Sequence, residues 1–548
     1  MTKIPEEKQR TALFLLVTII SGIVALWPYQ DFQYWIAQGD HGRDLYAFQK
    51  TMEGQLPYRD FFWVFGPLMP YYYAAFFKIF GLHIQSILLG QNLLFLCAGV
   101  LTFLAARVFM APSLAYVAAL WYWAFRGMDF FYTYNHAGGI VALLAAVYCL
   151  FLYVRQPLRR YAVTGSLALL LLMLIRFNMG VACLAAFLGN LLLIDVFLQN
   201  PDRRANRLFF VGLTGGMLAL AVLIYFLFLY PLPAYVFYQS FPFKKSMRTD
   251  MTPSLTLALR WLWEYCSKFS TTSIPKALFS GVVLLSLTQT LLPCWPLRKI
   301  SSGQKKGLAA LFITTSLLGF TLHEFLLSGV FYRLSWCTPL VILFCFLALQ
   351  QGTQRLSAQI RLLVALTLLF LGATTLLNDN TIITLSKQPQ RALTFNGKKI
   401  YTNQPPDWFL VVQYTSEFIK KTVPPGEKIF ALPFDPLYYF LSGHDSANRQ
   451  LIFFKHTNIP PQQEQDVIKD LVQQDVKYIF LSNRCHAVAE DLGIFGIDCC
   501  PTLYQYIKDN YDVLMTVGPW SAEPGWAWDH AVRILKKKPA AVVLPPAR

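Results

Sequence analysis

The sequence YAVTGSLALLLLMLIRFNMGVACLAAFLGNLLLIDVFL, residues 161–198, contains two long apolar runs on either side of Arg176. Each run approaches the roughly 20 residues that a helix needs to cross the hydrocarbon core of a bilayer. The few residues around Arg176 leave no room for a soluble element between the two runs. This stretch therefore predicts two consecutive transmembrane helices.

The rest of the chain has the same character. Of its 548 residues, 55% are hydrophobic and 14% are charged, and the mean hydropathy is +0.42. Soluble domains carry about 25% charged residues, so most of the first 378 residues should face lipid. We predict a polytopic α-helical domain over residues 1–378. Its eleven spans are expected at 11–28, 86–106, 112–127, 137–154, 161–177, 179–198, 208–230, 276–293, 307–327, 334–350 and 361–378.

The distribution of Lys and Arg orients these spans. With a cytoplasmic N-terminus, every loop assigned to the cytoplasm holds at least one cation, whereas the outer loops are longer and hold theirs more sparsely. This asymmetry is typical of multi-pass proteins. We therefore expect a protein of the cell (inner) membrane, with an extracytoplasmic C-terminal region. The net charge of +17 does not indicate a nucleic-acid partner, because the basic residues occupy short loops between spans.

Residues 379–548 predict a soluble extracytoplasmic α/β domain. Strand-like runs at 428–433, 450–454 and 477–482 alternate with a helical run at 463–475, and further strands are expected near DVLMTV and AVRILKKK. This alternation favours a partly parallel sheet. The region has no GxGxxG and no P-loop, so nucleotide binding is disfavoured. We expect an accessory domain that caps the active-site face or receives an acceptor.

Two outer loops, at 29–85 and 231–275, are too long to be simple connectors. The first contains two amphipathic stretches, GRDLYAFQKTMEG at 42–54 and PLMPYYYAAFFKIFG at 67–81. The second of these stretches is too short to span and rich in Tyr and Phe, so it should lie in the plane of the membrane interface. The loop at 231–275 mixes aromatic residues with cations.

Asp44 and Asp60 are the candidate acids of the first outer loop. They are sixteen residues apart and flank the turn-forming sequence GQLPY. A loop folded back on itself there would bring both acids to one site. The alternative is that both carboxylates are simply solvated, as most acids in loops are.

The segment GRDLYAFQKTMEGQLPYRDFFWVFGPL, residues 42–68, resembles the first periplasmic or luminal loop of the GT-C glycosyltransferases. That superfamily includes the protein O-mannosyltransferases and the lipid A aminoarabinose transferases. In this resemblance, Asp44 matches the first acid, Asp60 matches the second, and Gly66-Pro67-Leu68 precedes a membrane-parallel helix. Relatives often have Pro-Pro-Leu at that place, whereas this chain has Gly-Pro-Leu. The resemblance implies a GT-C-like fold and transfer of a sugar from a polyprenyl-phosphate donor to a lipid, polysaccharide or protein acceptor.

The same resemblance implies roles for individual residues. Asp44 is the expected general base, and Asp60 is expected to orient the acceptor or to share that role. Arg176 is the expected cation for the donor phosphate, although an arginine at the end of a span can also snorkel to the interface. Further substrate-binding residues are expected at Tyr58, Asp129, His136, Lys244, Lys245, Arg248 and Arg333. No metal site is expected to be required, while a divalent cation held by Asp44 and Asp129 stays an open alternative.

Two other functions are alternatives to glycosyl transfer. A lipid or glycan transporter, or flippase, would place polar residues near mid-span and break its helices there. In this chain the polar residues of the spans gather at their outer ends, as at Arg176, His323 and Glu324. The second alternative is a non-catalytic scaffold of the cell envelope. Only the motif that contains Asp44 and Asp60 argues against it.

Overall fold

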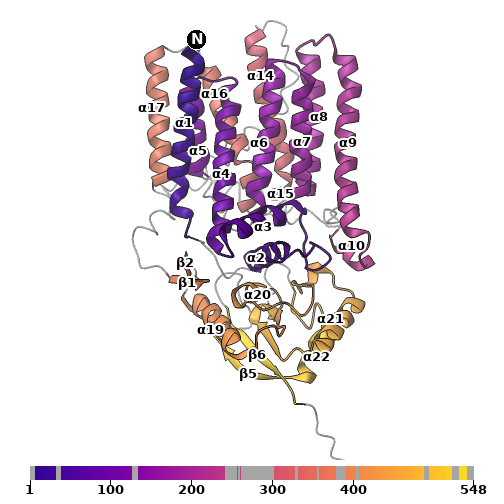
Figure 1. Ribbon diagram of the computed structural model, residues 1–548. Coiled ribbons are helices and arrows are strands. Elements are labelled where there is room, and N and C mark those ends of the chain that lie inside the picture. Colours follow the sequence, from indigo (N-terminus) through magenta and orange to yellow (C-terminus); the bar gives the residue numbers. More distant parts are fainter. Residues whose placement is uncertain are drawn as a thin grey trace, which may run out of the picture.

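The computed structural model describes residues 6–32, 39–125, 134–240, 256, 260, 302–326, 331–353, 357–377, 391–402, 406–486, 493–520 and 530–539. Long helices form a bundle, and a smaller domain of helices and strands covers one end of it (Figure 1). The N-terminus lies at the opposite end of the bundle from this domain (Figure 1). That end also holds Arg107, which donates to Glu7 at 2.6 Å, and Arg155, whose carbonyl accepts a hydrogen bond from Lys306 at 3.1 Å.

The bundle follows the apolar runs of the sequence. Its described helices are α1 (Glu6–Leu26), α4 (Ile84–Arg107), α5 (Pro112–Phe125), α6 (Tyr134–Arg155), α7 (Arg159–Ile175), α8 (Phe177–Phe197), α9 (Arg203–Leu229), α14 (Ser302–Thr321), α15 (His323–Leu326), α16 (Thr338–Thr353) and α17 (Ala358–Leu377). Among the described residues, seven helices are long and apolar enough to cross a membrane.

The expected number of eleven spans is not confirmed. Helix α7 has 17 residues, so it rises less than the ~30 Å of a bilayer core, and the described parts of α5 and α16 have 14 and 16 residues. The span expected at 276–293 lies outside the described residues. The two runs that flank Arg176 do form separate helices, α7 and α8.

Several helices expose apolar side chains on the outside of the bundle. On α17, Leu362, Leu363 and Phe370 expose 60%, 64% and 67% of their surface, and on α9 Leu208 exposes 79%. Contiguous apolar surface of this extent is stable against lipid and unfavourable in water. The chain is therefore a multi-pass membrane protein.

Two helices of the first outer loop lie across the end of the bundle, between the spans and the C-terminal domain (Figure 1). They are α2 (Gly39–Met52) and α3 (Leu68–Phe80). Pro67 precedes α3, and Gly81 ends it with a φ of 91°, a conformation that favours glycine. Both amphipathic stretches expected in this loop are confirmed as helices. Helix α10 (Ala234–Ser240) begins the second outer loop.

The C-terminal domain is an α/β domain, as expected. Its four-stranded sheet has the order β3-β4-β6-β5, in which β3 and β4 are parallel and the other neighbours antiparallel. The strands are β3 (Phe430–Leu432), β4 (Tyr478–Ser482), β5 (Tyr511–Val517) and β6 (Val532–Lys537), and a separate hairpin joins β1 (Arg391–Phe395) to β2 (Lys398–Thr402). The helices are α19 (Pro406–Thr422), α20 (Leu437–Ser442), α21 (Pro461–Gln473) and α22 (Pro501–Asn510).

The prediction of a strand at 450–454 is wrong. The backbone of this run belongs to no strand and forms no ladder: Phe453 donates to the carbonyl of Pro433 at 2.9 Å. The side-chain amide of Gln450 satisfies the carbonyl of Ile452 at 2.7 Å. The Leu, Ile and Phe side chains of this run are buried in the domain. A short apolar run is typical of buried chain in general, so the apolar pattern did not distinguish this segment from a strand.

Candidate functional site

Helix α2 is polar in sequence and yet almost completely buried. Twelve of its 14 residues are buried, and they include Arg43, Asp44 and Lys50. The cause is its position between α3 and the C-terminal domain (Figure 1). Charged side chains are stable in such a place only when they are paired, so their partners define the site.

Arg43 joins two acids of this helix. Its Nη1 donates to Oδ1 of Asp40 at 2.7 Å, and its Nε and Nη2 donate to Oδ1 of Asp44 at 2.9 and 2.7 Å. Asp44 is 1% exposed, whereas the side chain of Asp40, in the first turn of α2, is 36% exposed. Sequence reasoning identified Asp44 but missed both Asp40 and Arg43. The spacing of Asp40 and Arg43 by three residues, which places them on one helix face, was the available signal.

The surroundings of Asp44 change its acidity. Burial raises the pKa of Asp44 to about 7, although the positive charge of Arg43 acts in the opposite direction. The negative charge of Asp40 adds to the rise, and a backbone N–H of Tyr134 opposes it. A carboxyl group with such a pKa is half ionised near neutral pH and can exchange protons with a substrate there.

Phe65 connects this acid pair to Arg176. The guanidinium of Arg43 lies 4.9 Å from the centre of the Phe65 ring, and the guanidinium of Arg176 lies 5.2 Å from the same centre. Trp63 adds a second aromatic contact to Arg43 at 5.7 Å. Phe65 thus links Arg43, the partner of both acids, to the junction of α7 and α8, where Arg176 adopts an extended backbone between the two helices.

Arg176 is held by an acid from a distant helix. Its Nε donates to Oε1 of Glu324 at 2.7 Å and its Nη2 donates to Oε2 at 2.5 Å, a bidentate arrangement. Asn178 donates to Oε1 of Glu324 at 2.6 Å, and Nη1 of Arg333 lies 3.3 Å from Oε2. Glu324 was noted in the sequence only as a polar residue at a span end. Its partnership with Arg176 across 148 positions left no local signal.

His136 lies beside this ion cluster. Its ring is 4.9 Å from the ring of Trp336, which ends the 3₁₀ turn that carries Arg333. The charges of Arg176, Glu324 and Arg333 are close enough to act on His136. The structure therefore brings together four of the residues expected at the site: Asp44, Arg176, Arg333 and His136.

The close packing at Gly66 explains why the sequence before α3 is Gly-Pro-Leu in this chain. Its backbone N–H donates to the carbonyl of Ile175 at 2.9 Å, and a β-carbon at Gly66 would lie only 1.9 Å from the carbonyl oxygen of Leu174. The loop therefore packs directly onto the end of α7, next to Arg176. Any side chain at position 66 would push the two backbones apart.

The side chains of Tyr58 and Asp60 have their hydrogen-bond partners within the first outer loop. The hydroxyl of Tyr58 is buried and donates to the carbonyl of Phe65. Asp60 accepts from the backbone N–H of Leu56 at 2.8 Å and pairs with its exposed neighbour Arg59. These contacts place Asp60 within its own turn, and the bond to Arg59 lowers the pKa of Asp60.

Four expected site residues, Asp129, Lys244, Lys245 and Arg248, lie outside the described residues. Among the residues that the structure does describe, no group of three His, Cys, Asp or Glu side chains could hold a metal ion. Asp40 and Asp44 share Arg43, whose charge opposes a cation between them.

The fold of this chain, a helical bundle with a C-terminal α/β domain, is similar to that of an archaeal oligosaccharyltransferase in two solved structures. AglB from Archaeoglobus fulgidus, in complex with an inhibitory peptide and a dolichol-phosphate, matches 99% of this chain and 76% of its own, with a TM-score of 0.54 and 10% identity. The Archaeoglobus fulgidus oligosaccharyltransferase in complex with Zn and sulfate matches 86% of this chain and 68% of its own, with a TM-score of 0.52 and 12% identity.

ArnT from Cupriavidus metallidurans in the apo state matches 95% of this chain and 98% of its own, with 13% identity and a TM-score of 0.44. The fold assignment rests on the oligosaccharyltransferase structures alone. No protein-family model and no curated protein sequence matches the chain. The resemblance seen in the first outer loop is thus confirmed at the level of the fold.

Proposed function

We propose that this protein is a membrane glycosyltransferase that moves a sugar from a polyprenyl-phosphate donor to an acceptor at the outer face of the cytoplasmic membrane. One observation carries the proposal. The buried carboxyl group of Asp44, whose pKa is about 7, is paired with Arg43. The guanidinium groups of Arg43 and Arg176 both lie close to the Phe65 ring. Arg176 in turn forms a bidentate pair with Glu324, at the end of the bundle that the domain covers.

The acid supplies the proton acceptor. Arg43 occupies only Oδ1 of Asp44, so this carboxylate keeps lone pairs for an acceptor O–H or N–H. As Asp44 takes that proton, the acceptor atom bonds to the anomeric carbon, and the bond from that carbon to the phosphate oxygen breaks. General-base help of this kind contributes about 10²–10⁴-fold to a rate.

The cations stabilise the group that leaves. The lipid phosphate departs with the electron pair of the broken bond, and guanidinium groups bind such a phosphate with two hydrogen bonds each. Arg176 and Arg333 are the described residues suited to this. Glu324 pairs with both and orients them, while their combined charge still exceeds that of Glu324 by one unit.

Location supports a lipid-linked donor. The backbone contact between Gly66 and Ile175 places the loop acids at the end of a bundle helix, close to where a lipid phosphate would lie. The structurally similar AglB was solved with a dolichol-phosphate. The sugar and the acceptor are left unspecified.

Transport and scaffolding receive less support. A transporter is expected to gather its polar residues near mid-span. The ion cluster of Arg176 and Glu324 instead lies at a helix junction against the first outer loop. A scaffold would have no use for a buried acid with a pKa near 7, because burying such a group disfavours folding.

A transfer assay tests the proposal. The purified protein in lipid nanodiscs is given undecaprenyl phosphate carrying a radiolabelled hexose or pentose, together with envelope lipids, polysaccharide or protein. We expect transfer that needs a carboxylate at position 44, measured with the variant Asp44→Asn. Equal turnover by the wild type and this variant would refute the assignment of the base.

A further inference from the structure

Helix α2 packs against other parts of the protein on two opposite faces. One face is turned toward the spans and the other toward the C-terminal domain, and this division follows the helical spacing of three and four residues. The face toward the spans contains Phe48, whose ring lies 4.7 Å from Tyr73 and 5.9 Å from Tyr134, and His41, 5.5 Å from Tyr134. Asp44 belongs to this face, near the backbone N–H of Tyr134.

The opposite face begins with two glycines. A β-carbon at Gly39 would lie 2.4 Å from the ring of Phe434, and one at Gly42 would lie 2.4 Å from the backbone nitrogen of Leu437. The start of α20 therefore packs against the backbone of α2. Such a close approach couples the position of α2 directly to the domain.

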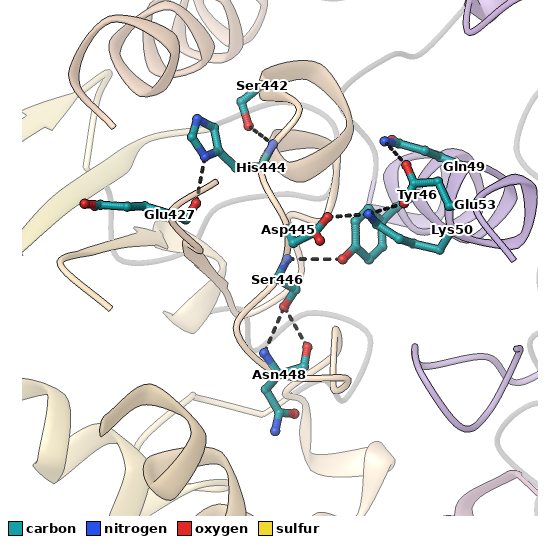
Figure 2. A network of polar contacts seen from close by, with 10 residues as sticks. All are labelled: Tyr46, Gln49, Lys50, Glu53, Glu427, Ser442, His444, Asp445, Ser446 and Asn448. Carbon is teal, nitrogen blue, oxygen red and sulfur yellow. Dashed lines mark hydrogen bonds and ion pairs between the residues drawn. The ribbon is translucent and has the colours of Figure 1, made fainter. Parts of the chain in front are cut away.

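Farther along the same face, polar contacts join α2 to the loop 442–448 (Figure 2). Lys50 forms an ion pair with Asp445, and the backbone N–H of Ser446 donates to the hydroxyl of Tyr46 at 3.1 Å. Glu53 binds the other side of Lys50 at 2.6 Å. The ring of Tyr46 also lies 5.2 Å from that of Tyr439, so polar and aromatic contacts coincide here.

The loop 442–448, which contacts α2, is hydrogen-bonded to the chain next to the sheet. The backbone N–H of Ile429, next to β3, donates to the carbonyl of Asp445 at 3.1 Å, and Ala447 donates back to Ile429 at 3.0 Å. Within the loop, Ser446 donates to the carbonyl of Asn448 at 2.7 Å, as Figure 2 shows. The loop is therefore a fixed support, and α2 is the element whose position it sets.

The contact between α2 and this loop depends on the charge of Lys50. Lys50 is 3% exposed, so its ammonium depends on Asp445 and Glu53 for compensation. The side chains of Asp445 and Glu53 are 43% and 37% exposed, so only the ammonium end of each pair is buried. Removing Asp445 leaves that buried ammonium with one compensating carboxylate in place of two, which disfavours its buried position. The loss of Asp445 should therefore shift or loosen α2, and Arg43 and Asp44 with it.

We propose that Lys50 and Asp445 are positioning residues, through which the C-terminal domain holds α2 so that Asp44 meets the Arg176 cluster. This inference rests on the proposed function. The domain then takes part in the chemical step, beyond capping the site or receiving an acceptor. Neither residue touches the reacting atoms: both act through α2.

The test uses the full-length protein in nanodiscs and the variants Asp445→Asn, Asp445→Glu and Lys50→Met. We expect Asp445→Asn and Lys50→Met to lower kcat about tenfold to a hundredfold, as small displacements of a reacting group do. The donor KM should stay within about twofold, because the Arg176 cluster is untouched. Asp445→Glu should restore most of kcat. The matched control is Lys537→Met, which removes an ion pair of the same domain with Asp475, and it should behave as the wild type.

A second variant acts without changing charge. Gly42→Ala adds one methyl group between α2 and Leu437, on the face opposite Asp44, and should lower kcat in the same way. Gly189→Ala, in α8, adds a methyl group where no atom lies within 4 Å and serves as its control. Wild-type kcat in both Asp445→Asn and Gly42→Ala would overturn the inference.

Hydrogen–deuterium exchange separates this inference from the proposed function. Peptides that cover α2 should exchange at least about tenfold faster in Asp445→Asn than in the wild type, whatever reaction the protein catalyses. Unchanged exchange would show that the pair does not hold α2. If the wild type transfers no sugar from any lipid-linked donor, the proposed function fails. Faster exchange of the α2 peptides in Asp445→Asn would still show that the domain holds α2 in place.

Discussion

Asp44 and Asp60 belong to the same outer loop and have the same side chain, but the structure gives them opposite environments. Asp44 is 1% exposed on a buried helix, and burial raises its pKa to about 7. The side chain of Asp60 is 26% exposed in a turn, where Arg59 and a backbone N–H lower its pKa. The comparison teaches that environment, more than residue type or nearness in sequence, decides which acid can work as a base near neutral pH.

The sharpest test of this difference is Asp44→Asn. Asparagine keeps the size and can still accept a hydrogen bond from Arg43, but it cannot take a proton from an acceptor. We expect the rate of sugar transfer to fall about 10²–10⁴-fold while undecaprenyl phosphate still binds. Rates are measured with labelled lipid-linked sugar, and binding by thermal shift with the lipid. Loss of both together would indicate a folding defect instead.

Arg176→Ala should have the next largest effect. It removes the bidentate partner of Glu324 and leaves that carboxylate near the expected phosphate position. We expect a loss of about 10²–10³-fold in kcat/KM, with a raised donor KM, because both binding and stabilisation of the leaving group suffer. Steady-state kinetics with varied donor concentration separate these terms. A change in kcat alone would argue against contact with the donor.

The pH profile extends the comparison to the wild-type protein. A base must be ionised to act, and the pKa of Asp44 is raised to about 7. We therefore expect kcat/KM to fall about tenfold per pH unit below pH 7 and to level off above it. Asp60, whose pKa is lowered, stays ionised over this range and contributes no inflection. A flat profile from pH 5 to 8 would remove Asp44 from the proton transfer.

Asp60→Asn should have the smallest effect. It weakens a pair in which the side chain of Arg59 is 54% exposed, and such surface pairs contribute little. Because Asn can still accept from Leu56, we expect activity within about threefold of the wild type. The assay is the same transfer reaction, run beside Asp44→Asn. A loss as large as that of Asp44→Asn would mean that both acids serve the reaction, as the sequence pattern suggested.

Much of the architecture could be predicted because it depends on local patterns. Apolar runs of span length predicted the bundle, and an aromatic stretch after Pro67 predicted α3. The run at 450–454 shows the limit of the same reasoning, since buried irregular backbone produces the apolar pattern of a strand. Span number also depended on context, because α7 ends after 17 residues at Ile175, where Arg176 takes an extended backbone.

The sequence by itself determined that the chain crosses a membrane, where most of its helices and strands lie, and which loop carries the candidate acids. Nearest neighbours along the chain and the period of apolar residues contain that information. Only the tertiary structure decided that Arg43 bridges Asp40 and Asp44, that Glu324 holds Arg176, and that the C-terminal domain packs against α2. These pairings depend on which surfaces meet after folding, and burial then sets their electrostatics, so no local pattern encodes them.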